Sequence, residues 1–242
     1  MSRPLRPGLN LIASANADLR RYGDESDFHT SRGGGRGGLR WSEGNHRLSG
    51  FLEGSRFYVG GDGYQHTTGL ALRYRYRLNE RSSVHGTARG ARLRYDDLEG
   101  LDSQLAWLGA GASRSWSALW NPRASFTVLA GQEDARESTR RARALAQRDM
   151  LELRANLSLD PAPDWTLRTG LRVRNSEYDT NTFPFSEARD ETWYSLDVGL
   201  DWRPDINWRV GPDVSYVKND ANIALYEYER TVIGLGARYL FF

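Results

Sequence analysis

The sequence predicts an all-β fold, a transmembrane antiparallel up-and-down β-barrel of about 12 strands, within a range of 12–14. Apolar residues recur at every second position over segments of about ten residues, which is the period of a strand and the length that crosses a bilayer at a tilt. The connections between these segments alternate between short and long. The final segment alternates in the same way and ends on aromatic residues.

The composition agrees with such a barrel. The chain has 242 residues, of which 26% are charged, and its mean hydropathy is -0.66. Strands of a membrane barrel carry a lipid-facing residue only at alternate positions, so a hydrophilic average is expected. Lys218 is the only lysine, and the net charge of +2 comes almost wholly from arginine. Arginine suits crowded pairing with carboxylates and favours a charge-lined interior, although a GC-rich genome would give the same bias.

Twelve alternating segments can be placed along the chain. They lie near residues 9–19, 33–42, 46–58, 68–78, 83–95, 103–115, 123–134, 151–159, 165–173, 194–202, 208–216 and 231–241.

The fourth segment shows the pattern most clearly. Thr68, Leu70, Leu72, Tyr74, Tyr76 and Leu78 alternate with Gly69, Ala71, Arg73, Arg75 and Arg77. No amphipathic helix has this period. Of the segments before it, the first alternates Leu and Ala with polar residues, the second ends with Leu39 and Trp41 in phase, and the third follows a tight turn at Gly44-Asn45.

The middle segments alternate less evenly. In 83–95 the phase is poor, and we expect a bulge near Ala91 that switches the faces. The segments 103–115 and 123–134 flank a short connection that ends at Pro122. The charged stretch 134–147 can hold a short helix, and the clean strand 151–159 stops at the proline-rich run 160–164.

The last four segments resume the alternation. In 165–173 and 194–202 leucine, valine and tryptophan oppose arginine and aspartate. Pro212 lies within 208–216 and has no amide hydrogen, so this strand needs a bulge or a local break. The segment 231–241 closes the chain.

The connections define two ends of the barrel. Those at 44–45, 79–82, 117–122, 160–164 and 203–207 are short, whereas those near 20–32, 96–102, 134–148, 179–191 and 217–229 are longer and more polar; the short link at 59–63 breaks the pattern. Bacterial barrels have short periplasmic turns and long external loops, so an even strand count places both termini in the periplasm.

Aromatic residues gather at both ends of the segments. Trp41, Trp120, Trp165, Trp202 and Trp208 lie beside the short turns, where a periplasmic aromatic girdle is expected. A second set near the long loops comprises Tyr22, Tyr58, Tyr64, Tyr95, Tyr178, Tyr216, Tyr226 and Tyr228. Ordinary strand propensity also explains each aromatic residue taken singly.

Charged residues opposite the lipid-type residues are expected to point into the lumen. This predicted charge ladder comprises Arg73, Arg75, Arg77, Arg154, Arg168, Arg172, Arg174, Arg238, Glu152, Asp197 and Asp201. The ladder either fills and rigidifies a narrow interior or lines a polar passage that prefers anions. Twelve strands fall between barrels filled by their own side chains and open porins, which favours the filled interior.

The sequence offers no convincing catalytic set, so we expect a protein that is not an enzyme and needs no metal or cofactor. None of the four histidines has metal-ligand spacing, and His66 and His85 stay the only candidates for a catalytic group at the rim. The glycine run 33–38 resembles an RGG segment, but Leu39 and Trp41 continue it in strand phase. We therefore expect a strand with crowded neighbours there, and no nucleic-acid partner.

A soluble β-sandwich would also alternate. Its strands are typically about 5–6 residues long, whereas these segments reach about ten or more, so the barrel is favoured.

The closing segment resembles the last strand of bacterial outer-membrane barrels, whose terminal aromatic residue is read by the assembly machinery. Tyr239, Phe241 and Phe242 would carry this signal. The resemblance implies a bacterial outer-membrane location in a Gram-negative envelope, with outer-membrane lipid and the barrel assembly machinery as partners.

The stretch before the closing strand resembles the barrel domain of surface lipoprotein assembly modifiers, the Slam family. The residues that carry the likeness are Asn219, Asn222, Ile223, Leu225, Tyr226, Tyr228, Glu229 and Arg230. The Arg148-Asp149 and Arg189-Asp190 pairs are similar to the family's style but less specific. The resemblance implies export of lipoproteins or other proteins to the cell surface, with client lipoproteins as partners and no cofactor. Its rival is a small porin-like solute channel or a structural barrel with a charge-filled lumen.

The resemblance also implies domains beyond this chain. Members of the family join a periplasmic tetratricopeptide domain to a barrel of fourteen strands, whereas residues 1–242 are expected to form a single barrel domain. The first eight residues lack the apolar run of a signal peptide. We therefore expect that a leader preceded this chain, and that the chain is either a truncated relative without its periplasmic repeat domain or a barrel that shares only the closing motif.

Overall fold

The computed structural model describes residues 2–20, 29–96, 99–137, 139–181 and 184–239. The strands are β1 (Ser2–Arg6), β2 (Leu9–Arg20), β3 (Thr30–Glu43), β4 (His46–Val59), β5 (Asp62–Arg77), β6 (Ser82–Tyr95), β7 (Ser103–Ser115), β8 (Arg123–Ala135), β9 (Arg148–Ala162), β10 (Trp165–Asn181), β11 (Ala188–Trp202), β12 (Trp208–Ala221) and β13 (Tyr228–Tyr239). Three short helices lie between them: η2 (Glu99–Leu101), α1 (Arg140–Ala146) and η3 (Ala224–Tyr226).

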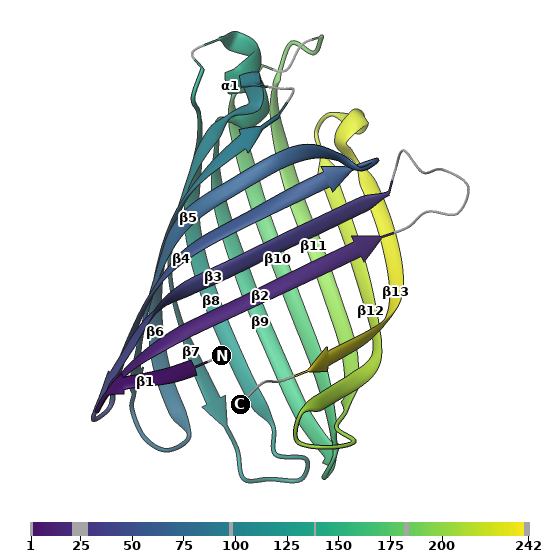
Figure 1. Cartoon of the computed structure of the whole chain (residues 1–242). Coiled ribbons are helices and arrows are strands. Elements are labelled where there is room, and N and C mark those ends of the chain that lie inside the picture. The colour runs from purple at the N-terminus through teal and green to yellow at the C-terminus, as the bar shows by residue number, and fades with distance from the viewer. Residues whose placement is uncertain (1, 21–28, 97–98, 138, 182–183, 240–242) are drawn as a thin grey trace.

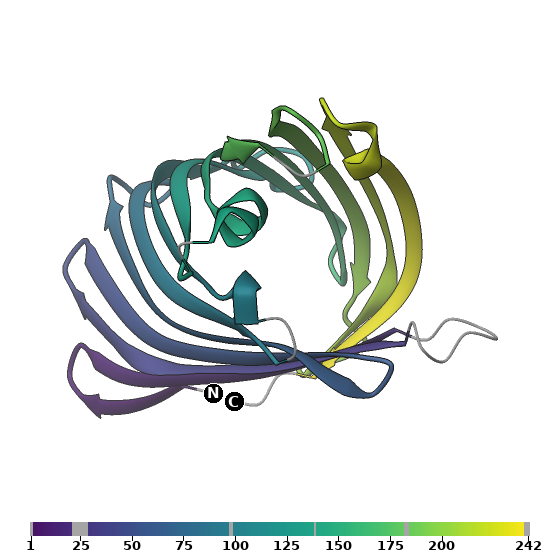
Figure 2. The same cartoon turned by 90° about the horizontal axis from the view of Figure 1, so that it is seen from above.

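The strands form one antiparallel sheet in chain order, β1 to β13. The sheet curls round on itself as a barrel, and its strands are tilted (Figures 1 and 2). Within the described residues, no strand pairing joins β13 to β1 or β2. The chain-order pairing and the curl of the sheet confirm the up-and-down barrel predicted from the sequence.

The described residues form 13 strands, one more than the twelve segments counted in the sequence and within the predicted range. The additional strand is β1, whose residues Ser2 to Arg6 pair with β2 through a turn in which Gly8 has φ +78°. With only five residues, β1 is too short to show an alternating pattern of its own.

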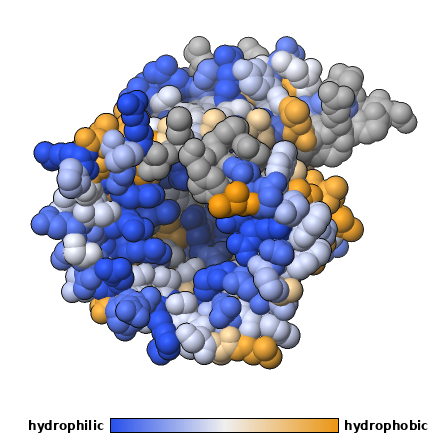
Figure 3. Space-filling view, turned by 60° about the horizontal axis from the view of Figure 1, so that its bottom comes forward, coloured by the Kyte–Doolittle hydropathy of each residue, from blue (hydrophilic) through white to orange (hydrophobic). Residues whose placement is uncertain are grey.

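The outer face of the wall is apolar and exposed, as lipid contact requires. Leu52, Leu108 and Ile233 have exposed fractions of 71%, 69% and 77%. Charged and small residues occupy the alternate, inward positions, and Figure 3 shows hydrophilic side chains around the opening. Within the described residues, no helix is long and apolar enough to cross a membrane.

Several strands extend further toward the long loops than the sequence predicts. β10 continues from the predicted end at 173 to Asn181, and β11 begins at Ala188 rather than at 194. Beyond the bilayer both faces of a strand meet water or protein, so the apolar alternation fades while the backbone ladder continues. The helix expected within 134–147 is confirmed as α1, with Thr139 as its N-cap.

The bulge expected near Ala91 is wrong. β6 pairs with β5 and β7 in unbroken register, with Ala91 opposite Gly69 and Leu105. Small residues rather than a change of phase explain its weak alternation.

The break expected at Pro212 is confirmed. The ladder between β11 and β12 runs from Glu191 to Gly199 and resumes only at Trp202, so the positions opposite Gly211 and Pro212 are skipped. A Cβ on Gly211 would overlap the carbonyl oxygen of Leu200. The glycine run is crowded in part: a Cβ on Gly38 would overlap the carbonyl oxygen of Gly50, whereas a Cβ on Gly33 or Gly37 would meet no atom within 4 Å.

Candidate functional site

The lumen contains a water-accessible cavity of about 1150 Å³ at the end of the barrel that carries the short turns. We call this the short-turn end and the opposite one the loop end. The cavity is lined by the turns at 44–47 and 79–83 and by inward residues of β4, β5 and β7–β13. Figure 3 looks toward this end and shows the hollow with hydrophilic side chains around it.

Most of the predicted charge ladder meets in this cavity. Its lining includes Arg75, Arg77, Arg154, Arg168, Arg172, Asp197 and Asp201. Arg73 lies two positions from Arg75 on β5, and Glu152 is buried, with 4% of its surface exposed. Arg174 lies two positions from Arg172, and both guanidinium groups lie 5.3 Å from the ring centre of Trp193. The backbone of Arg238 pairs with Arg209 on β12, and the position of its side chain is not described.

Arginines and carboxylates are paired along the wall made by β8–β12. The ion pairs are Arg123 with Asp160 at 2.7 Å, Arg168 with Asp201 at 2.7 Å, Arg172 with Asp197 at 3.3 Å, and Arg154 with Glu152. Asp197 also accepts hydrogen bonds from the hydroxyls of Ser195 and Ser215, at 2.9 and 2.7 Å. The Arg154–Glu152 and Ser195–Asp197 contacts lie within one strand, whereas the others link neighbouring strands. We call this face the paired wall.

Two short helices lie within the lumen at the loop end. Figure 2 shows α1 and η2 inside the ring of strands. α1 contacts β8, β10 and η2, and Ala142, Ala144 and Ala146 are 1%, 4% and 5% exposed. The cavity described above lies at the opposite, short-turn end, and its lining includes no residue of α1.

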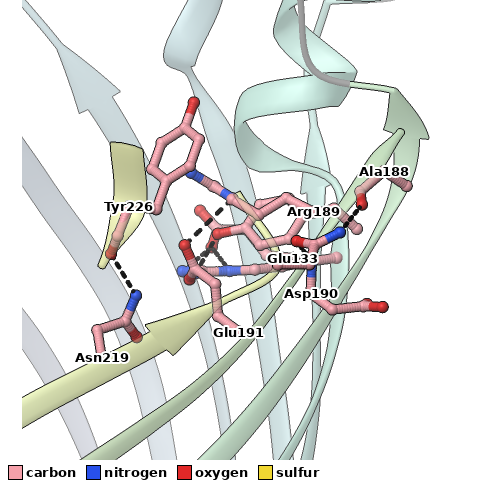
Figure 4. A network of polar contacts seen from close by, with 10 residues as sticks. Glu133, Ala188, Arg189, Asp190, Glu191, Asn219 and Tyr226 are labelled. Atoms are coloured by element: carbon pink, nitrogen blue, oxygen red, sulfur yellow. Dashed lines mark hydrogen bonds and ion pairs between the residues drawn. The ribbon is translucent and has the colours of Figure 1, made fainter. Parts of the chain in front are cut away.

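A buried arginine organises the loop end near α1. Arg189 is 7% exposed, and its guanidinium lies between two rings, 3.8 Å from the ring centre of Tyr178 and 4.0 Å from that of Tyr226. Nε of Arg189 lies 3.2 Å from Oε1 of Glu191, but without the angle of a hydrogen bond, so this attraction is electrostatic. Figure 4 shows Arg189, Glu191 and Tyr226 together. Cation–π contacts of this kind strengthen where water is excluded.

A second arginine continues this network across the lumen wall. Arg148 donates to Oε2 of Glu133 from Nε and Nη2, at 3.0 and 2.8 Å, and to the hydroxyl of Tyr178 at 2.7 Å. The other oxygen of Glu133 accepts a hydrogen bond of 2.6 Å from Ser103, whose surface is fully buried. Strands β7, β8, β9 and β10 are thus linked by side chains at the same level. We call this group, with Arg189, Glu191 and Tyr226, the arginine–tyrosine cluster.

The family-like segment folds onto this cluster. Nδ2 of Asn222 donates to the carbonyl of Ala188, and its Oδ1 accepts from the backbone N–H of Asp190, both at 2.8 Å. Asn219 donates from Nδ2 to the carbonyl of Tyr226 at 2.8 Å, and Ile223 is 2% exposed (Figure 4).

The other residues of the segment are more exposed. Leu225 and Tyr228 are 74% and 50% exposed, Glu229 accepts a hydrogen bond of 3.3 Å from the hydroxyl of Tyr216, and Arg230 is exposed opposite Val217. The asparagines, Ile223 and Tyr226 therefore fix the η3 loop, whereas Leu225 and Tyr228 are available for contact.

The sequence did not indicate that Arg148 and Arg189 are buried and linked. The available signal was the repeated Arg-Asp pair at the starts of β9 and β11, which was noted only as a weak family feature. Of the tyrosines noted near the long loops, Tyr178 and Tyr226 pack on Arg189, whose guanidinium lies over both rings, and Tyr178 is 5% exposed. Tyr22 lies outside the described residues.

The tryptophans of the expected girdle lie at the short-turn end. Trp41, Trp120, Trp165, Trp202 and Trp208 are 38%, 49%, 37%, 44% and 41% exposed, and the rings of Trp165 and Trp202 are stacked. Of the expected assembly signal, the backbone of Tyr239 ends β13, and Phe241 and Phe242 lie outside the described residues.

The two histidines considered for a catalytic role lie apart. His85 faces the lumen, where its Nε2 lies 3.0 Å from the hydroxyl of Thr127. Nε2 of His66 lies 3.6 Å from a carboxylate oxygen of Asp96, the residue after the end of β6. The structure does not bring the two together.

Comparison with known proteins identifies the family. The model of the surface lipoprotein assembly modifier family matches residues 3–241. No curated protein gave a significant match.

Solved structures with a similar fold are membrane barrels. The CymD monoaromatic hydrocarbon channel has a TM-score of 0.53 and 10% identity, with 96% of this chain and 78% of that chain covered. The KdgM porin has a TM-score of 0.49 and 14% identity, covering 96% and 99%. The β domain of the Bordetella autotransporter BrkA has a TM-score of 0.48 and 14% identity, covering 97% and 100%.

At 10% identity, the likeness to the CymD channel supports the fold alone. The family match covers almost every residue of the chain. The chain therefore belongs to the surface lipoprotein assembly modifier family and is a β-barrel of the bacterial outer membrane.

Proposed function

We propose that this barrel helps to move lipoproteins or other proteins across the outer membrane to the cell surface. The observation that carries the proposal is the family match over residues 3–241. The family-like segment adds to it, because Asn219, Asn222 and Ile223 build a defined loop at the end of the barrel expected to face outward.

The geometry of the lumen is compatible with this role. Its cavity opens at the short-turn end, which in bacterial barrels faces the periplasm, the side from which a client arrives. α1 lies within the ring of strands at the loop end, so we expect it to narrow a passage through the lumen. The proposed partners are the barrel assembly machinery during insertion and client lipoproteins during transport.

The test is surface display of a client lipoprotein on co-expression with this barrel, joined to its periplasmic domain where the gene encodes one. Display is measured by accessibility of the client to protease or antibody on intact cells. We expect display with the barrel and none with empty vector. A correctly inserted barrel that gives no display of any co-encoded lipoprotein would contradict the proposal.

A second candidate function is a small solute channel, and the charged, water-accessible cavity favours it. Single-channel recordings in planar bilayers separate the two functions. Conductance without client display would overturn the transport role and support the channel.

A further inference from the structure

The wall opposite the paired wall carries arginines without carboxylate partners. Arg47 on β4 and Arg75 on β5 are directly opposite in register, and both line the cavity. One step toward the loop end, Arg40 on β3 and Arg73 on β5 flank Ser49 of β4. Among the described residues, none of these four arginines makes an ion pair with a carboxylate. We call them the cationic wall.

This arrangement is unfavourable by itself. Like charges directly opposite each other across two strands are destabilising. Arg40 is within electrostatic range of Arg36, Arg47 and Arg73, and its Nε is buried without a hydrogen-bond partner in the described part of the chain. On the paired wall a carboxylate compensates most arginines, so the contrast is a property of β3–β5 and not of the whole lumen.

The nearest inward carboxylate on these strands is already engaged. Glu53 lies opposite Arg36 on β3 but makes its ion pair with Arg89 of β6. Arg47, Arg73 and Arg75 are exposed to the lumen, so their guanidinium groups can reach a ligand without a change in the barrel. An anion from outside the chain is the partner that this wall lacks.

We propose that the cationic wall binds an acidic, extended polypeptide segment that enters from the short-turn end. The two rungs, Arg40 with Arg73 and Arg47 with Arg75, are separated by two residues along antiparallel strands, about 6.8 Å. Side chains on one face of an extended peptide have the same spacing. Aspartates or glutamates at alternate positions of a client would therefore meet successive rungs, each through charge-assisted hydrogen bonds.

The inference rests on the proposed function, because it names the chemistry of the client segment. The lumen position disfavours a membrane lipid, since these arginines project from the face opposite the lipid-facing leucines, such as Leu48 and Leu72. A phosphate-bearing ligand is the alternative anion, and the experiment below distinguishes it from an acidic peptide.

The experiment measures binding to the purified full chain in detergent micelles by fluorescence anisotropy. The probes are a labelled peptide of alternating aspartate and glycine, the same peptide with asparagine, and inorganic tripolyphosphate, whose own binding is measured by isothermal titration calorimetry. The test variant is Arg47→Ser with Arg75→Ser. The matched control is Arg168→Ser with Asp201→Ser, which removes an arginine from the same cavity without changing the net charge.

We expect the aspartate peptide to bind, the asparagine peptide not to bind, and the test variant to bind at least about tenfold more weakly. The control is expected to keep most of the affinity. The test variant should also unfold at a higher urea concentration than the wild type in the absence of peptide, because repulsion between Arg47 and Arg75 is removed. A merely structural role for these arginines would give the opposite shift.

In the binding experiment, three results would overturn the inference: no binding of the aspartate peptide by the folded wild type, equal loss in the control, or binding of tripolyphosphate without binding of the peptide. Its failure is distinguishable from that of the proposed function. Client display that persists in the Arg47→Ser, Arg75→Ser variant overturns this inference alone. Peptide binding without any client display supports peptide binding by the cationic wall but contradicts the transport role.

Discussion

At the scale of single residues, arginine has different roles at the two ends of the lumen. At the loop end Arg189 is enclosed by two tyrosine rings and faces Glu191, and their side chains are only 8% and 13% exposed. At the short-turn end Arg47, Arg73 and Arg75 are exposed to the cavity. Burial and partners, rather than residue type, separate a structural arginine from one available to a ligand.

Replacing Arg189 with alanine should destabilise the barrel by about 3 kcal/mol. The change removes both cation–π contacts and leaves Glu191 as a buried charge without its partner. Urea unfolding in lipid vesicles, followed by tryptophan fluorescence, measures the free energy of unfolding. Lys218→Ala is the control, because Lys218 and Asp220 form an exposed pair and should contribute less than about 1 kcal/mol. Equal effects of the two substitutions would contradict the structural role of Arg189.

Replacing Asn222 with alanine should release the η3 loop. Its side chain makes two hydrogen bonds to the backbone at the start of β11, and their loss should cost about 1–3 kcal/mol locally. Hydrogen exchange read by mass spectrometry should rise over residues 222–228 and stay unchanged in β4 and β5. Leu225→Ala, at a residue that is 74% exposed, should leave the exchange as in the wild type.

At the scale of elements, the strands make the wall of the barrel, and the short helices α1 and η2 lie inside it at the loop end. β2–β13 are 12 to 17 residues long, enough to cross a bilayer at a tilt with residues to spare. α1 has only seven residues and is held by its N-cap and by three buried alanines rather than by its own length.

Replacing residues 139–147 with a glycine–serine linker of equal length should increase single-channel conductance. The helix occupies the loop end of the lumen, and a flexible linker lacks the alanine contacts that hold it against β8 and β10. Recordings in planar bilayers measure the change. Arg141→Ala with Arg143→Ala keeps the helix and its buried face, so its conductance should match the wild type. An unchanged conductance in the linker variant would show that α1 does not limit the passage of ions.

At the scale of the whole molecule, the barrel has a lipid-facing surface bordered by tryptophan at one end and an interior of opposed charged walls. Trp41, Trp116, Trp165, Trp202 and Trp208 are exposed, as is Trp120 in the turn, whereas Trp107 and Trp193 face inward. Tryptophan at a membrane interface places its apolar ring toward the lipid and its N–H toward water.

Lipids brominated near the headgroup should therefore quench most of the tryptophan fluorescence of the reconstituted barrel. A variant with phenylalanine at positions 41, 116, 120, 165, 202 and 208 retains only Trp107 and Trp193 and should be quenched much less. Fluorescence in vesicles with and without brominated lipid measures the difference. Strong quenching of that variant would contradict the inward position of the two remaining tryptophans.

The sequence by itself determined the barrel wall. Lipid on one side of a strand and water on the other force alternation at a period of two. The local pattern therefore predicts that Leu70 and Leu72 face the lipid and that Arg75 faces the lumen. The inward direction of Arg154, Arg168 and Arg172 followed from the same rule, as did the exposed tryptophans beside the short turns.

Only the tertiary structure decided which charges meet. Arg168 and Asp201 are 33 residues apart, and Arg47 and Arg75 are 28 apart. That Arg168 has a carboxylate partner, whereas Arg47 and Arg75 have none among the described residues, depends on strand register and on neighbours across the sheet. The placement of α1 inside the ring and of Arg189 between Tyr178 and Tyr226 likewise arises where loops fold back onto the barrel. A local alternation rule carries no information about such contacts, because they join segments whose separation in sequence is not fixed by any period.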